Sequence, residues 1–203
     1  MKQLWQNYRR DHRWRAGASL GVHLAYGLYK GALAWWYTSA WFAATAVYYL
    51  SVAGIRGLLL RDRSWGEGTE AAWRKYRLCG WLLLALTAAI GGVNFYTIRE
   101  NRAVVYPWHL IYGAAAYTFY SLTAALVRLL RRGAPGPLAM ADRQLSLAAA
   151  LMALFSLQVA LLAAFGGSDF PQRAWNAATG FAVVAAVAVL AVQMIRRGCR
   201  ELQ

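Results

Sequence analysis

The fold is decided by apolar runs such as LSLAAALMALFSLQVALLAAF at residues 145–165, in which 21 consecutive positions carry no charged side chain. At a rise of 1.5 Å per residue, a helix of about 20 residues crosses the ~30 Å hydrocarbon core of a bilayer. Similar runs recur along the 203 residues, of which 60% are hydrophobic and 15% charged. This composition is not that of a soluble domain, and it indicates a polytopic membrane protein.

Six membrane spans are predicted. Their ranges are 16–36, 38–60, 78–98, 108–127, 145–165 and 174–195. Lipid offers the backbone no hydrogen-bond partner, so each span must be a helix or part of a closed barrel, and these runs lack the apolar and polar alternation of barrel strands. The sequence therefore predicts an all-α, single six-helix membrane domain over residues 1–203, without a soluble catalytic domain.

The basic residues predict the orientation of the spans. With the N-terminus inside, all but four of the 22 Lys and Arg residues lie on the cytoplasmic side. The four exceptions are Lys30, Arg99, Arg102 and Arg173. Because positive charge in short loops stays in the cytoplasm, both termini are predicted there, in the cytoplasmic (inner) membrane.

The net charge of +14 follows from this orientation. We attribute it to topology and to contact with anionic headgroups, and we expect no binding of nucleic acid. Residues 1–15 combine Leu4, Trp5 and Tyr8 with basic side chains, so they are expected to lie along the inner membrane surface.

Three tryptophans suggest an internal repeat. Trp41, Trp108 and Trp175 follow one another at intervals of 67 residues, and each opens an even-numbered span. An inner-face arginine follows each of them after 20 or 21 residues, at Arg61, Arg128 and Arg196. The spacing is typical of one helical hairpin repeated three times, with space for a ligand between the hairpins. Hairpins of equal length explain the same spacing without a repeat, and both interpretations stay open.

Small residues predict where helices approach closely. Gly17 and Gly21 form a small-xxx-small face in the first span, and the last two spans are rich in alanine. The pair Gly91 and Gly92 is expected either to pack closely or to interrupt the third span beside Asn94. Thr69 before Glu70 predicts a helix start, whereas the prolines in 133–142 predict a connecting loop.

All eight acidic residues fall outside the predicted spans. They are Asp11, Asp62, Glu67, Glu70, Glu100, Asp142, Asp169 and Glu201. Ion-coupled transporters commonly hold a carboxylate inside the membrane, and metal carriers and metal-dependent enzymes need clusters of Asp, Glu, His or Cys. The sequence therefore predicts no metal site, no cofactor and no enzymatic activity, and Cys79 and Cys199 are interpreted as reduced structural thiols.

One string keeps a catalytic alternative open. Residues 17–21 read GASLG, the G-x-S-x-G pattern, and His23 follows Ser19 by one helical turn. The pattern normally needs a strand-to-helix elbow and a third group that orients the histidine. We therefore favour a hydrogen bond from Ser19 to a backbone carbonyl over an intramembrane serine hydrolase. Haem is not expected, because His23 and His109 lie at different depths.

The polar side chains at membrane depth are mostly uncharged. The candidate ligand-binding residues are His23, Tyr26, Asn94, Tyr112, Tyr117, Tyr120 and Gln158. They either hydrogen-bond between helices or line a neutral polar and aromatic cavity, which suits an uncharged or aromatic ligand or a weakly hydrated anion. Lys30 and Arg56 are expected to extend their head groups to the interface, where Lys30 could attract an anion.

The sequence thus favours a small membrane protein that binds or translocates a small solute, alone or as the membrane subunit of a transporter. The alternative is a non-transporting interaction or regulatory protein, whose basic cytoplasmic face docks a partner or anionic lipid. A partner subunit or a homo-oligomer is compatible with both functions.

Overall fold

Six α-helices make up the described chain. The computed structural model describes the backbone of residues 2–62, 68–99, 108–130, 136–165 and 171–203, and their side chains except those of 2–13, 94, 96–99, 108 and 109. The helices are α1 (Lys2–Tyr37), α2 (Ala40–Arg61), α3 (Glu70–Arg99), α4 (Trp108–Leu130), α5 (Pro137–Phe165) and α6 (Gln172–Arg200). These residues contain no strand, which confirms the all-α prediction.

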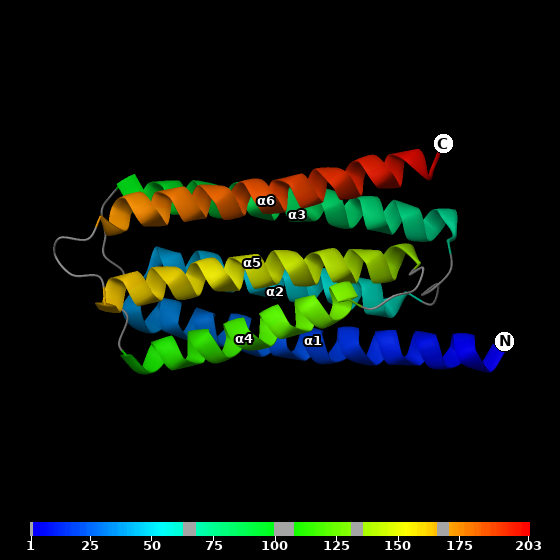
Figure 1. The fold of residues 1–203 in the computed structure, drawn as a ribbon, viewed down its shortest axis with the longest axis horizontal. Coiled ribbons are helices and arrows are strands. Elements are labelled where there is room, and N and C mark those ends of the chain that lie inside the picture. Colours follow the sequence, from blue (N-terminus) through cyan, green and yellow to red (C-terminus); the bar gives the residue numbers. More distant parts are fainter. Residues whose placement is uncertain (1, 63–67, 100–107, 131–135, 166–170) are drawn as a thin grey trace.

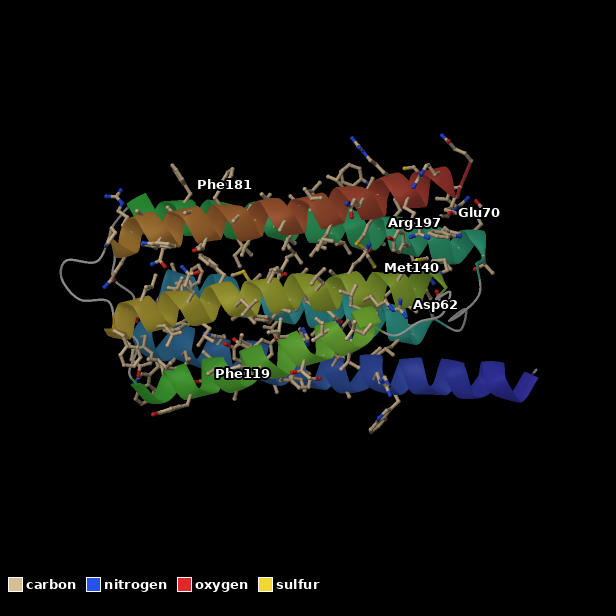
Figure 2. The ribbon with its side chains drawn as sticks, viewed as in Figure 1. Asp62, Glu70, Phe119, Met140, Phe181 and Arg197 are labelled. Carbon is tan, nitrogen blue, oxygen red and sulfur yellow. The ribbon has the colours of Figure 1, made fainter. Side chains whose placement is uncertain are left out.

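Five of the six helices have the length and composition of a membrane span. Within the described ranges, α2 to α6 are long and apolar enough to cross a bilayer. The apolar part of α1 does not reach this level, because polar residues such as His23 and Lys30 interrupt it. Phe119 and Phe181 point away from the bundle (Figure 2), as lipid-facing side chains do.

The helices are longer than the predicted spans. α5 begins at Pro137 inside the predicted loop, because proline is tolerated in the first turn of a helix, where its missing N–H has no partner to lose. α3 begins after Thr69, whose hydroxyl oxygen accepts a hydrogen bond from the N–H of Ala72 at 3.3 Å. Residues 2–15 continue α1 without a break, and their position at a membrane surface stays a prediction.

The bundle consists of three antiparallel pairs. Figure 1 shows α3 beside α6, and it places both chain termini at the same end. Contacts join α1 to α2, α4 to α5 and α3 to α6 most extensively. In the described chain, α3 and α4 belong to different pairs, so the second hairpin that the repeat requires is not formed. Trp41 is buried whereas Trp175 is half exposed, so these positions are not equivalent, and the repeat stays a sequence prediction.

Two clusters form the core. The first joins α2, α3, α5 and α6 near the end that carries the termini, and it includes Leu59 and Met194. The second is rich in aromatic residues, and in it the rings of Trp41 and Phe155 meet edge to face at 5.6 Å. α5 contributes small side chains such as Ala153 to the core, which lets its neighbours approach closely.

The closest approaches of α3 and α6 are at Gly80 and Gly198, and the predicted Gly17 and Gly21 face no neighbour. A Cβ on Gly80 would lie 2.9 Å from the Cβ of Met194, and one on Gly198 would lie 2.8 Å from the Cβ of Arg77. A Cβ on Gly17 or Gly21 would have no neighbour within 4 Å, so the predicted small-residue face on α1 is not a packing face here. α3 also runs through Gly91 and Gly92 without interruption.

Candidate functional site: a buried basic cluster

Arg56 is the most deeply buried charged side chain described. It lies on α2 with 0% of its surface exposed, so the prediction that it extends to the interface is wrong. It stands five positions before the end of α2 at Arg61, and its guanidinium group turns into the bundle toward α1 and α5. Its Nη1 donates to the hydroxyl of Ser19, and its Nη2 donates to the hydroxyl of Ser146 at 2.7 Å.

Asp142 is the counter-charge of this arginine. Its Oδ1 lies 3.5 Å from Nε of Arg56, and its Oδ2 accepts a hydrogen bond from Nη1 of Arg128 at 2.9 Å. Asp142, which the sequence places outside the predicted spans, lies in a helix long enough to span a membrane and is only 6% exposed, so its carboxylate is buried inside the bundle. The cause is the early start of α5 at Pro137, which places Asp142 in its second turn.

Arg128 closes the cluster from α4. It donates to the hydroxyl of Ser146 and, through Nη2, to the backbone oxygen of Arg15 at 3.1 Å. We call Ser19, Arg56, Arg128, Asp142 and Ser146 the Arg56 cluster. It joins α1, α2, α4 and α5 at one depth.

The Arg56 cluster carries one positive charge in excess. Two guanidinium groups face one carboxylate, in surroundings of low polarity where an uncompensated charge is costly. Nε of Arg56 and Oδ1 of Asp142 are too far apart to share a hydrogen bond, and neither has another hydrogen-bond partner among the described residues. The site is therefore cationic and incompletely hydrogen-bonded, whereas the sequence predicts a neutral lining.

An aromatic cluster continues from Ser19 along the bundle. We define it as His23, Tyr26, Tyr49 and Tyr117. The rings of Tyr26 and Tyr117 are stacked, with centroids 3.6 Å apart and an angle of 3° between their planes. The ring of Tyr49 meets both edge to face, at 4.9 Å and 5.1 Å. The ring of His23 lies 6.0 Å from that of Tyr117, so the four rings form one contiguous group.

His23 connects the two clusters through Ser19. Its Nδ1 lies 2.6 Å from the backbone oxygen of Ser19, and since a carbonyl oxygen can only accept, Nδ1 carries the proton. Its Nε2 is then an acceptor, buried and without a hydrogen-bond partner in the described chain. The hydroxyl of Ser19 accepts from Arg56, and no hydrogen bond is described between it and the ring of His23. The two side chains are therefore not arranged as a nucleophile and its base.

Further buried hydroxyl groups surround the rings. The hydroxyl of Tyr49 is close to that of Ser156, and the hydroxyl of Tyr117 is close to that of Ser121. Neither pair has the geometry of a good hydrogen bond in the described structure. Buried hydroxyl groups normally have a hydrogen-bond partner. Hydroxyl groups without a good partner are therefore available to a polar ligand.

Lys30 lies at the far end of the aromatic cluster. It is only 2% exposed, so it does not extend to the interface as predicted. Its Nζ lies 5.4 Å from the ring centre of Tyr26 and 5.0 Å from that of Phe42, within the range of cation–π attraction.

The structure brings together only part of the predicted site. Of the candidate residues, His23, Tyr26 and Tyr117 lie together, but Tyr112 on the same helix as Tyr117 is 67% exposed. Gln158 hydrogen-bonds to the hydroxyl of Thr179 on α6 at 2.8 Å, which favours the predicted alternative of a bond between helices.

Two other candidates remain outside the assembled site. Tyr120 is 37% exposed at its border, and the side chain of Asn94 lies outside the described residues.

The missed residues are Tyr49 and the charged members of the Arg56 cluster. One sequence signal was present, because Asp142 stands only three residues before the run at 145–165 and one turn before Ser146. The described residues contain no group of three or more His, Cys, Asp or Glu side chains arranged to hold a metal ion.

Comparison with known proteins adds no relative. No family model, curated protein or solved structure matches the chain.

Proposed function

We propose that the chain is a multi-pass protein of the cytoplasmic membrane that binds a small monovalent anion at the Arg56 cluster and passes it between its helices. The observation that carries this proposal is the excess positive charge of the cluster, buried at a depth where two arginines share one aspartate. Ionisable side chains inside a membrane bundle are costly, and they commonly mark a substrate or ion pathway.

A monovalent anion fits this charge better than other small solutes. One bound negative charge makes the cluster neutral and so offsets the uncompensated cation in the low-polarity interior. The free donors nearby, Nε of Arg56 and the hydroxyl groups of Tyr49 and Tyr117, can hydrogen-bond to an anion, and a weakly hydrated anion loses little hydration when it enters. A metal cation is disfavoured because both arginines repel it.

A polar face of α1 supplies the path. Ser19, His23, Tyr26 and Lys30 are separated by four, three and four residues, so they share one face of the helix and are all buried. The eleven residues from Ser19 to Lys30 correspond to about 16 Å along the helix axis. The path has Arg56 at one end and Lys30 at the other, so an anion meets a cation at each end.

The stacked rings of Tyr26 and Tyr117 close this path. Their centroid distance of 3.6 Å is van der Waals contact and leaves no room for an ion between them. Passage therefore requires the two rings to separate, and the structure corresponds to a closed state.

The proposed orientation follows the basic residues. Both termini face the cytoplasm, and the Arg56 cluster lies about 8 Å from the cytoplasmic ends of α2 and α5, by five residues at 1.5 Å each. An anion therefore reaches Arg56 first from the cytoplasm and Lys30 first from the exterior.

Anion binding by purified Arg56→Gln protein tests the proposal. Titration calorimetry with thiocyanate, nitrate and chloride should show binding to the unaltered protein and its loss in the variant. The variant keeps one cation and one anion, Arg128 and Asp142, so the remaining pair is neutral and the protein is expected to fold. The control is Arg61→Gln, an exposed arginine five residues later on the same helix, which should leave binding unchanged. Equal affinities for both variants would contradict the proposal.

A further inference from the structure

A second site lies between α2 and α3, away from the Arg56 cluster. An apolar groove of about 580 Å³ opens there, within the size range of small-ligand pockets. Its walls are Ile55, Leu58 and Leu59 from α2 and Leu78, Cys79 and Leu82 from α3. These side chains supply no charge and little polarity, so the groove suits a hydrocarbon occupant.

Three charged side chains form the rim of the groove. They are Arg61, Asp62 and Lys75. Lys75 is ion-paired with Asp62, and the Lys75 side chain is still 48% exposed. Arg61 is exposed and has no ion pair with a described residue. The rim therefore carries one positive charge in excess. This charge is on Arg61, whose side chain is free to bind a ligand.

The position of the groove matches one leaflet of a bilayer. Asp62 stands at the end of the bundle that carries both termini (Figures 1 and 2), where α2 ends and a membrane helix meets the headgroups. From Lys75 to Leu82 the groove follows α3 for seven residues, or about 10 Å, which is most of the ~15 Å that one leaflet contributes to the hydrocarbon core. A charged rim at headgroup level above an apolar wall is the shape of a phospholipid site.

We infer that this groove binds one anionic phospholipid, with an acyl chain against the leucines of α2 and α3 and the phosphate at Arg61 beside Lys75. A specific lipid site differs from the general contact of a basic face with headgroups, because that contact needs no groove. A soluble peptide is a poor occupant, because the groove faces hydrocarbon. The inference is independent of the Arg56 cluster, since the two sites share no residue.

Native mass spectrometry of the detergent-purified chain tests the inference. After incubation with phosphatidylglycerol or phosphatidylcholine of identical chains, one phosphatidylglycerol should be retained in preference. Arg61→Gln should weaken its retention about fivefold, the factor that corresponds to ~1 kcal/mol per cation near a headgroup. The matched control is Arg200→Gln, an exposed arginine of α6 that does not line the groove.

A second variant tests the acyl chain. Leu82→Trp fills the apolar wall and should reduce retention of both lipids, whereas Leu130→Trp, at an exposed leucine that ends α4, should not. Glycerol 3-phosphate, which carries the same phosphate without chains, should not displace the lipid.

Three results would overturn the lipid site. They are equal effects of Arg61→Gln and Arg200→Gln, unchanged retention in Leu82→Trp, and displacement by glycerol 3-phosphate. Failure of the anion proposal would be recognised separately, because Arg56→Gln should bind phosphatidylglycerol normally in every case.

Discussion

Asp142 stabilises the fold because it is the carboxylate that lies between the buried Arg56 and the partly buried Arg128. Its two oxygens face Arg56 at 3.5 Å and Arg128 at 2.9 Å, from different helices. Asp142 compensates both cations, so its removal leaves two uncompensated charges, whereas removal of either arginine leaves a neutral pair. The effects of substitution at the residue scale follow from this dependence.

Asp142→Asn should destabilise the protein by about 3–5 kcal/mol, because the buried Arg56 and the partly buried Arg128 then face no anion. Unfolding in detergent, followed by far-ultraviolet circular dichroism, measures the loss. Under the anion proposal, added thiocyanate should restore part of the stability by taking the place of the carboxylate. Glu70→Gln removes one partner of the exposed ion pair with Arg74 and should change stability by less than about 0.5 kcal/mol. A variant as stable as the unaltered protein without added anion would show that Asp142 does not balance the cluster.

Tyr117→Ala should open the path that the stacked rings close. We expect faster anion flux into liposomes that contain this variant, since Tyr26 then has no stacking partner, while the affinity at the Arg56 cluster stays unchanged. Tyr112→Ala is the matched control on the same helix, because Tyr112 points outward and should have no effect. Flux that is equal in the two variants would argue against Tyr117 as a barrier.

At the scale of elements, α3 and α6 pack closely because glycine backbones replace side chains at two levels. Gly80 on α3 lies against Met194 and Ala191 on α6, and Gly198 on α6 lies against Arg77 on α3. In lipid this close contact is what holds two helices together, since hydrocarbon solvent gives no hydrophobic force between them. Glycines that do not face a neighbour have no such function.

Gly80→Ala and Gly17→Ala should therefore have opposite effects. The first places a Cβ 2.9 Å from Met194 and 3.1 Å from the backbone oxygen of Ala191, so it should destabilise the protein by about 1–3 kcal/mol. The second meets no atom within 4 Å and should be neutral or stabilising by up to about 1 kcal/mol, because alanine favours helix over glycine. Thermal unfolding of both variants provides the comparison, and a loss of stability only in Gly17→Ala would refute this packing.

At the scale of the whole molecule, both termini lie at one end of the bundle. The chain must therefore pass along the bundle an even number of times. α1 is too polar to qualify as a span by composition, but it packs along α2 over the bundle, where its polar face is covered by α2 and α4. A helix that would be unfavourable alone in lipid is therefore accommodated by its neighbours.

Reporter fusions at both chain ends test this arrangement. Under the proposed topology all six helices cross together and the basic residues stay on one side, so we expect a cytoplasmic signal from both fusions. Deletion of α1 should leave the C-terminus on the same side of the membrane. It should also expose Tyr49, Arg56 and Tyr117 to lipid, and so reduce the amount of folded protein. Termini on opposite sides would show that α1 does not cross with the others.

The sequence by itself determined the helical class and the approximate positions of the helices, and it singled out His23, Tyr26 and Tyr117, because hydrophobic length and helical spacing are local properties. It predicted the wrong environment for Arg56, Lys30 and Asp142, since distance from a span boundary does not tell which way a long side chain turns. Only the tertiary structure decided that α5 brings Asp142 between Arg56 and Arg128, and that α3 pairs with α6. Charge compensation and helix pairing join residues far apart in the chain, and no local pattern encodes them.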